Sequence, residues 1–228
     1  EDVEVGSKAR LYLTITGNPS GVETVTINAN SYDGYVTTTI YDASGNAMSS
    51  SQTTGAIILK DITAPTVSSI TSSTADGNYK IGDVIAVTVT FSESVIVTGT
   101  PQLTLETGDA DAVVDYSSGS GSTILTFNYT VASGQINSDL DYTSTSALAL
   151  NSGTIKDAAG NAATLTLSSP GGGTSLGSNK DIVVDGIIPT ASTLSPADDA
   201  TAASPNSNLT ITFSEDVAAG SGNLIIKK

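Results

Sequence analysis

The sequence predicts an all-β fold, and three observations lead to this prediction. Thr, Ser, Val, Ile, Ala and Gly dominate the 228 residues, and this mixture favours short strands joined by turns. Turn signals that contain Gly, such as ADGN, ETGD and AAGN, recur along the middle of the chain. No segment carries the i, i+3, i+4, i+7 apolar spacing of a capped amphipathic helix.

Three short motifs occur twice, and together they indicate a repeated unit. In the middle of the chain a Pro-Thr pair comes first, a strand then ends at the Glu of TFSE, and an Asp-x-x-Gly-Asn hairpin follows. Internal repeats of this kind are typical of tandem arrays of similar domains. The copies are DITAPT at 61–66 with DGIIPT at 185–190, TFSE at 90–93 with TFSE at 212–215, and DASGN at 42–46 with DAAGN at 157–161.

These motifs divide the chain into three predicted units. Residues 64–187 contain every motif and are predicted to form one complete domain. Residues 1–63 lack the Pro-Thr start and are predicted to be a partial or unusually short domain. Residues 188–228 stop after TFSE and are predicted to be the N-terminal part of a third domain. We expect the chain to be an excerpt from a longer array.

The central unit is predicted to be an immunoglobulin-like β-sandwich. About seven or eight short strands separated by turns are typical of this architecture. The chain has no Cys and no Trp, which excludes the Cys–Trp–Cys core of antibody domains but not the sandwich itself. The Gly-rich segment 170–178 is predicted to be a loop. The predicted strands are 66–71, 84–91, 102–106, 112–116, 123–131, 147–151, 163–167 and 181–184.

The charge of the chain excludes some partners and favours others. The net charge is −15, from 23 acidic and 8 basic residues. Nucleic acid would be repelled, because binding it requires a basic face, and the same holds for an anionic membrane surface. No apolar run has transmembrane length, so we expect no membrane insertion in this segment. An acidic surface instead suits cations.

The composition also argues against an enzyme. The chain contains no Cys and no His, which excludes thiolate nucleophiles, Ser-His-Asp triads and the usual zinc sites. A glycosidase with paired carboxylates remains an alternative. The acidic residues, however, lie on repeated loops and not in one long-loop pocket. We therefore expect no catalytic activity.

The motifs also carry a family resemblance. Residues 65–190 resemble a widespread bacterial Ig-like repeat in segments such as GNYKIGDVIAVTVTFSESVIVTGTPQLTLETG and DLDYTSTSALALNSGTIKDAAGNAATLTL. The tail from PTASTLSPADDA onwards resembles the start of an Ig-like type found in S-layer and other cell-surface proteins, and residues 1–63 resemble a shorter Ig-like domain. The resemblance implies an extender segment of a large secreted or surface adhesin outside the bacterial cell. It also implies neighbouring Ig-like domains of the same chain as partners, and Ca²⁺ at the domain junctions.

Four residues are predicted to meet where the first and second units join. Loops of an Ig-like sandwich cluster at its two ends. Asp61 lies in the linker before the sandwich, Glu93 follows its second strand, and Asp157 and Asn161 belong to the DAAGN hairpin. Three carboxylates and an amide oxygen, with carbonyls and water, supply the oxygen ligands that Ca²⁺ prefers. The sequence therefore predicts a structural Ca²⁺ site at this junction.

The second junction repeats part of this pattern. Asp185 lies in the next linker, and Glu215 follows the second strand of the third unit. Asp76, in the ADGN turn, is predicted to point to the same end and to contribute to a second Ca²⁺ site. The matching Asp-x-x-Gly-Asn hairpin would come after Lys228, so this site is expected to be incomplete here.

Each of these residues also has an explanation that needs no metal. Asp-x-x-Gly-Asn is a natural tight hairpin, because Asp caps the turn and Gly and Asn accept positive φ. Glu93 and Glu215 fit the role of edge charges that discourage pairing between sheets. Asp61 and Asp185 fit the role of solvated linker residues. The acidic run 109–115 is interpreted as a loop that leads into a strand, with a peripheral cation site as the alternative.

The leading functional prediction is a structural extender, and the alternative is an adhesion module that binds a glycan or a host protein. Trp is absent and the eight Tyr are scattered, which argues against an aromatic platform for sugars. Other surface proteins or glycans remain possible partners in the alternative.

Overall fold

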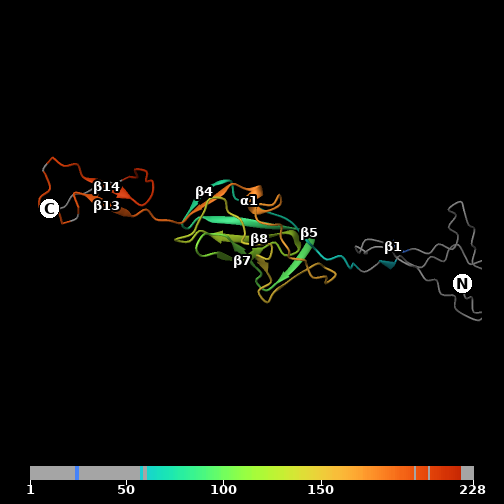
Figure 1. Cartoon of the computed structure of the whole chain (residues 1–228). Helices are drawn as coiled ribbons and strands as arrows, with labels where there is room; N and C mark the ends of the chain where they lie inside the picture. The colour runs from blue at the N-terminus through green and yellow to red at the C-terminus, as the bar shows by residue number, and fades with distance from the viewer. Residues whose placement is uncertain (1–23, 26–56, 59–60, 198, 205, 222–228) are drawn as a thin grey trace, which may run out of the picture.

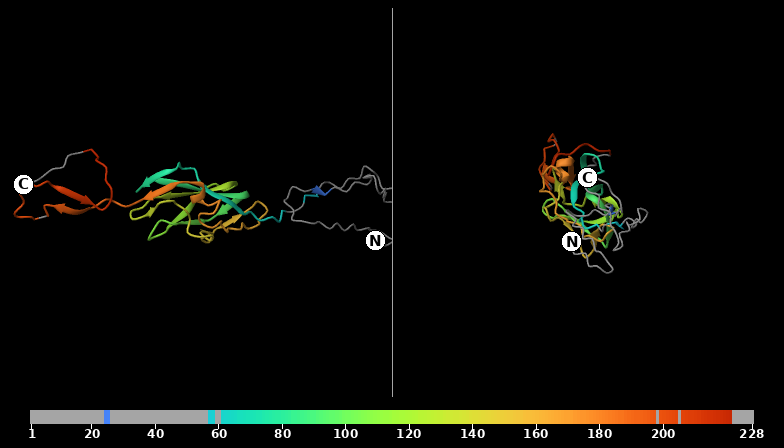
Figure 2. Two further views of the ribbon diagram at one scale, coloured as in Figure 1. Left: turned by 45° about the horizontal axis from the view of Figure 1, so that its top comes forward. Right: turned by 90° about the vertical axis from the view of Figure 1, so that its right-hand side faces the viewer.

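The computed structural model describes residues 24–25, 57–58, 61–197, 199–204 and 206–221. The chain enters a central β-sandwich at one end and leaves it at the opposite end (Figures 1 and 2). We call the first the leading end, approached by residues 61–66, and the second the trailing end, followed by residues 186–190. The predicted all-β sandwich is confirmed. The predicted domain 1–63 falls almost entirely outside the described residues.

Short strands make up nearly all of the regular structure. The strands before the sandwich are β1 (Thr24–Val25) and β2 (Ile57–Ile58), which pair antiparallel. The sandwich contains β3 (Val67–Ser72), β4 (Gly77–Lys80), β5 (Val84–Thr98), β6 (Gln102–Leu105), β7 (Ala112–Ser118), β8 (Ser122–Thr130), β9 (Ile136–Asn137), β10 (Leu148–Ala149), β11 (Thr154–Lys156), α1 (Leu176–Asn179) and β12 (Ile182–Asp185). β13 (Ala191–Ser195) and β14 (Thr210–Phe213) follow it.

The long strand β5 organises the main sheet. Its buried positions alternate with less buried ones from Val84 to Phe91, because successive side chains of a strand point to opposite faces. β3 and β8 pair antiparallel with its two edges, and β11 pairs with its last residues. Fully buried side chains from these and neighbouring strands form one core, which includes Ile85, Val87, Leu103, Leu125, Phe127, Tyr142 and Ile182.

The pairing of β5 with β8 is interrupted near the leading end. Thr90 pairs with Ile124, but the next paired residue of β5 is Val95. Such an irregularity bends the strand and redirects the side chains within it. Glu93 lies in this interruption, which explains how a residue of a long strand comes to face the incoming linker.

Two smaller groups of strands complete the sandwich: β6 with β10, and β4 with β9 and β12. β7 pairs with β6 through residues 112–115 and with β8 only at Tyr116 and Ser118, so it connects the β6 group to the main sheet around β5. β10 extends the β6 side. β12 pairs parallel with β4 and antiparallel with β9, and this pairing holds the end of the chain that leaves the sandwich.

The structure differs from the sequence prediction at several places. The predicted strand 84–91 continues to Thr98 as β5, and β9 and β11 were not predicted as separate strands. Residues 163–167 form no strand, and only Thr164 among them makes an isolated bridge, with Thr66. The ADGN segment was predicted to be a turn, but Gly77 and Asn78 begin β4. The one-turn helix α1 occupies part of the predicted loop 170–178, and the Ser175 side chain caps it by accepting from the Ser178 N–H.

Candidate metal centre

Three carboxylates meet at the leading end of the sandwich. Asp61, Glu93 and Asp157 each offer an oxygen, and these oxygens all lie within 4.8 Å of one another. Asp157 is buried, and Asp61 and Glu93 are half-buried. The sequence prediction that these three residues converge therefore agrees with the geometry. The predicted ion itself stays a prediction.

The incoming linker is held against the sandwich by backbone contacts. The Ser92 N–H donates to the Thr66 carbonyl at 2.8 Å, and the Thr66 N–H donates to Ser92 Oγ at 3.0 Å. The Thr164 N–H donates to the Pro65 carbonyl at 2.8 Å. Asp61 precedes these contacts in the chain. Its Oδ1 accepts from the Thr63 N–H at 2.8 Å, and this hydrogen bond fixes the carboxylate in a tight turn.

The DAAGN hairpin presents Asp157. The Asp157 N–H donates to the Asn161 carbonyl at 3.1 Å, and the Asn161 N–H donates to Asp157 Oδ1 at 2.8 Å. Gly160 has a φ of +95°, a left-handed conformation that glycine adopts without strain. Asp-x-x-Gly-Asn can therefore be both a tight hairpin and part of a metal site, because the hairpin holds the Asp157 carboxylate in the group with Asp61 and Glu93.

Asn161 acts as a donor at the centre of this group. Its Nδ2 donates to Asp157 Oδ2 at 2.7 Å, to the Asp61 carbonyl at 3.2 Å and to the Thr63 carbonyl at 3.3 Å. Three acceptors surround this one atom, so the orientation of the amide is well determined. Asn161 was predicted to supply an amide oxygen. The geometry instead makes it the residue that joins the linker to the hairpin and orients Asp157.

The carboxylates of this group have different electrostatic environments. Burial raises the pKa of Glu93, and the negative charges of Asp61 and Asp157 raise it further. Burial also opposes ionisation of Asp157, but hydrogen bonds from the Asn161 side chain and from the backbone of residues 159–161 outweigh it, so the pKa of Asp157 is lowered. Asp157 is therefore stabilised as an anion by its hairpin, whereas the Glu93 carboxylate has no hydrogen-bond or ion-pair partner among the described residues.

The donor set fits a hard divalent cation. Ca²⁺ takes oxygen ligands at about 2.3–2.6 Å, so two ligands on opposite sides of the ion lie roughly 5 Å apart. Oxygens that all lie within 4.8 Å of one another fit around one such ion. The Asp61 and Thr63 carbonyls, both bonded to Asn161, bring further oxygens close to this group. The group contains no nitrogen or sulfur ligand of the kind that favours zinc.

The second junction reproduces the backbone geometry of the first. The Ser214 N–H donates to the Thr190 carbonyl at 2.8 Å, and the Thr190 N–H donates to Ser214 Oγ at 3.0 Å, as Ser92 and Thr66 do. Asp185 Oδ1 accepts from the Ile187 N–H at 3.1 Å, as Asp61 does from Thr63. Phe213 pairs with Ala191 where Phe91 pairs with Val67, and a register shift follows in both hairpins.

The predicted carboxylates of the second junction are only partly brought together. Glu215 Oε1 is buried and has no hydrogen-bond partner in the described part of the chain. Among the described residues, Asp185 and Glu215 belong to no group of three acidic side chains. Asp76 has other partners, since it accepts from the Asp181 N–H at 3.3 Å and lies 3.6 Å from Lys180 Nζ. These partners lie at the start of β12, whereas Asp185 is its last residue, so Asp76 does not contribute as predicted.

The sequence interpretation missed Ser92 and the two linker carbonyls. Ser92 fixes the linker, and its counterpart Ser214 does the same at the second junction. The repeated TFSE motif contained this signal, because the Ser recurs beside the Glu in both copies. The role of the Asp61 and Thr63 carbonyls could not be predicted from the sequence, since every residue carries a backbone carbonyl oxygen.

Comparison with known proteins finds one similarity, in the C-terminal part of the chain. Residues 185–227 match a family described as Bacterial Ig-like domain. Comparisons with curated proteins and with solved structures gave no match. The match begins at the second junction and includes β13 and β14. Domains of this family are structural or binding modules that occur in bacterial surface proteins.

The fold is all-β, and the similarity of residues 185–227 to a Bacterial Ig-like domain is consistent with a bacterial surface module. In the part of the chain that the structure describes, no helix is long and apolar enough to cross a membrane.

Proposed function

We propose that this chain is a structural extender segment of a bacterial surface or secreted adhesin, in which Ca²⁺ stiffens the junction at the leading end. The observation that carries the proposal is the origin of the three carboxylates. Asp61 comes from the linker, whereas Glu93 and Asp157 come from two separate parts of the sandwich. An ion bound by all three ties the linker to the domain that follows it.

The charge of the chain gives the physical reason for such an ion. The net charge is −15, and the three carboxylates repel one another at the leading end. Without a cation this repulsion favours a linker that swings away from the sandwich. A bound divalent cation replaces the repulsion with attraction and restricts the linker.

The partners in this proposal are the neighbouring Ig-like domains of the same chain, and its location is outside the bacterial cell. The match of residues 185–227 to a Bacterial Ig-like domain supports both points. The division into units 1–63, 64–187 and 188–228 belongs to the same proposal. It is supported by the matching hydrogen bonds of the two linkers.

Calorimetric titration of the metal-free chain with Ca²⁺ tests the proposal. We expect binding with a Kd of about 10⁻⁵ to 10⁻³ M, and a gain in unfolding free energy of roughly 2–3 kcal/mol at a hundredfold excess over Kd. Glu93→Gln should weaken binding at least tenfold. Glu106→Gln is the matched control, because Glu106 is exposed and, among the described residues, its carboxylate accepts only from the Gly108 N–H.

Small-angle scattering with Ca²⁺ and with EGTA then tests the stiffening. We expect a narrower distribution of interdomain distances with Ca²⁺. Equal heats and equal scattering curves in the two conditions would show that the carboxylates are only a charged surface.

A further inference from the structure

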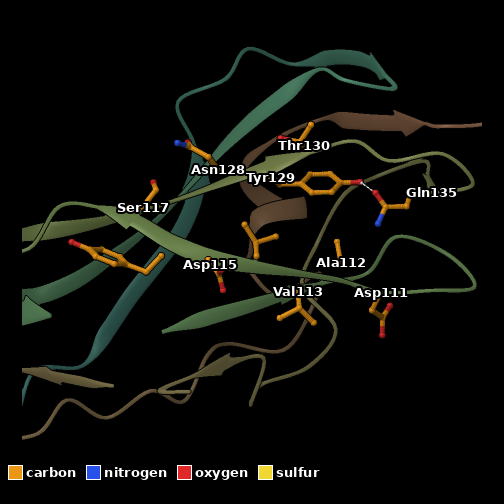
Figure 3. Close-up of a pocket in the computed structure, with 11 residues that line it drawn as sticks. Asp111, Ala112, Val113, Asp115, Ser117, Asn128, Tyr129, Thr130 and Gln135 are labelled. Carbon is orange, nitrogen blue, oxygen red and sulfur yellow. Dashed lines mark hydrogen bonds between the residues drawn. The ribbon is translucent and has the colours of Figure 1, made fainter. Parts of the chain in front are cut away.

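An open groove of about 640 Å³ runs along β7 and β8 (Figure 3). Residues 111–117 form one wall and residues 128–130 form the other, with Gln135 at one end. At about 3.3 Å per residue, the β7 wall is roughly 20 Å long. This length corresponds to about six residues of an extended peptide.

The walls of the groove are strand edges that do not pair with each other. The β7–β8 ladder stops at Tyr116 and Phe127. Beyond this point Ala112–Asp115 pair only with β6, and Asn128–Thr130 pair only with β5. An edge of this kind presents backbone groups to which another strand can add.

Gln135 adds a directed donor to the groove. Its Oε1 accepts from the Tyr129 hydroxyl and from the Ala132 N–H, both at 2.8 Å. These two donors fix the orientation of the amide. The Nε2 group has no hydrogen-bond partner in the described part of the chain, and it points into the groove beside Ala112 (Figure 3).

The groove is acidic, and no Lys or Arg is among the described residues that line it. Asp111 and Asp115 line it, and both are exposed. Neither belongs to an ion pair in the described part of the chain, where the pairs are Lys80–Asp83 and Lys180–Asp76. Asp115 Oδ1 accepts from Gln102 Nε2 at 2.8 Å, which leaves its second oxygen for another group. The exposed Val113 provides an apolar contact between the two carboxylates.

We propose that this groove binds an extended basic peptide segment of a partner protein. The peptide pairs its backbone with the strand edges of β7 and β8 and presents Lys or Arg to Asp111 and Asp115. The charge of the groove disfavours a second copy of this chain, which is itself acidic. A glycan would need an aromatic platform, but Tyr129 is buried and Tyr116 is half-buried, with its ring edge-on to Phe127. This interaction is separate from the Ca²⁺ junction and does not require it.

NMR of the ¹⁵N-labelled full chain tests the proposal, with a capped octapeptide of alternating lysine and valine as the probe. We expect shift changes confined to the amides of residues 111–117, 128–130 and 135. The affinity should fall as salt is added, because exposed charges are screened. A peptide with glutamate in place of lysine should not bind. A peptide that is N-methylated at alternate residues should bind at least tenfold more weakly, because it cannot pair along one edge.

The double variant Asp111→Asn with Asp115→Asn should weaken binding about five- to tenfold. Asp76→Asn with Asp216→Asn removes the same charge from exposed residues outside the groove and should leave the affinity unchanged. If the N-methylated peptide bound as tightly as the unmodified peptide, strand pairing would be excluded and only charge attraction would explain the binding. Shift changes outside the groove, or a neutral glycan that occupies the same residues when the peptide does not, would overturn the proposed occupant.

Discussion

Asn161 holds both carboxylate oxygens of Asp157. Its Nδ2 donates to Oδ2 at 2.7 Å, and its backbone N–H donates to Oδ1 at 2.8 Å. The same Nδ2 reaches the carbonyls of Asp61 and Thr63 in the linker. One side chain therefore orients the buried carboxylate and connects the linker to the sandwich.

Asn161→Ala should destabilise the sandwich by roughly 2 kcal/mol, because it removes a hydrogen bond to a buried carboxylate and two to linker carbonyls. Chemical denaturation measures this loss. Asn78→Ala is the control, because Asn78 is exposed on β4 and makes no side-chain hydrogen bond in the described part of the chain. Equal stability of the two variants would contradict the role of Asn161.

Glu93→Gln should have opposite effects with and without Ca²⁺. In EGTA at neutral pH the variant should be more stable than the wild type by roughly 1 kcal/mol, because it relieves repulsion from Asp61 and Asp157. With Ca²⁺ it should be less stable, since a ligand is lost. Thermal melting in both buffers measures the two signs. The same sign in both buffers would contradict a metal role for Glu93.

The pH dependence follows from the raised pKa of Glu93. A raised pKa means that the folded state holds the Glu93 proton more tightly than the unfolded state, so this contribution favours folding at low pH. It is lost as the pH rises from the ordinary value of 4.5 through the folded pKa. The stabilising effect of Glu93→Gln in EGTA should therefore disappear when the melts are repeated below about pH 4.

Asp157 should show the opposite dependence. Its pKa is lowered because the folded state stabilises the ionised carboxylate. This contribution to stability is fully present above the ordinary pKa of 3.8 and is lost as the pH falls through the folded pKa.

The affinity for Ca²⁺ should fall as the pH approaches the Glu93 pKa from above, because the proton and the ion compete for the Glu93 carboxylate. Calorimetry in a series of buffers measures the change, and a constant affinity from neutral pH to pH 4.5, the ordinary value of the Glu pKa, would contradict it.

Gly186→Ala should destabilise the trailing end by about 2 kcal/mol or more. An added Cβ would overlap the Ala132 carbonyl and would lie 2.8 Å from the Gln135 carbonyl, and both are backbone atoms that cannot move aside. Gly186 also bonds to Gln135 and Gly134 through its own backbone. Gly173→Ala is the control, because a Cβ there meets nothing within 4 Å. Thermal melting separates the two variants.

Leu125→Ala and Ile124→Ala should differ strongly although the residues are adjacent in β8. Leu125 is fully buried, so its truncation should cost about 2–5 kcal/mol. Ile124 is 45% exposed, and its truncation should cost less than about 1 kcal/mol. Urea denaturation followed by tyrosine fluorescence measures both values. Similar costs would contradict the burial pattern of β8.

Much of the fold could be predicted because each strand carries its own signal. The alternation of Ile85, Val87, Val89 and Phe91 marks the buried face of β5, and the Gly-containing turns mark its neighbours. The short strand β4 carries no such alternation, because its residues are mostly exposed and it exists by pairing with β12. Local sequence cannot reveal an element that depends on a partner about a hundred residues away.

The candidate metal centre was predictable to the level of residues but not of atoms. The repeated motifs indicated which segments meet at the leading end, and Asp61, Glu93 and Asp157 do meet there. Whether Asn161 offers its amide oxygen or its amide nitrogen to the carboxylate group could not be read from the sequence. The linker carbonyls of Asp61 and Thr63 favour the nitrogen, because each accepts a hydrogen bond from Nδ2. The prediction for Asp76 was wrong because Asp76 lies beside the start of β12, where it contacts Lys180, whereas Asp185 is the last residue of that strand.

The arrangement of β3 and β12 determines how the sandwich responds when its two linkers are pulled apart. β3 continues from the leading linker, and β12 runs into the trailing linker, at opposite ends of the domain (Figure 1). A pull along the chain therefore slides β3 past β5 and β12 past β4. The hydrogen bonds of these ladders lie across the direction of the pull, so they share the load and break together instead of one at a time. The strand pairing makes the sandwich hardest to extend along the axis that joins its two linkers.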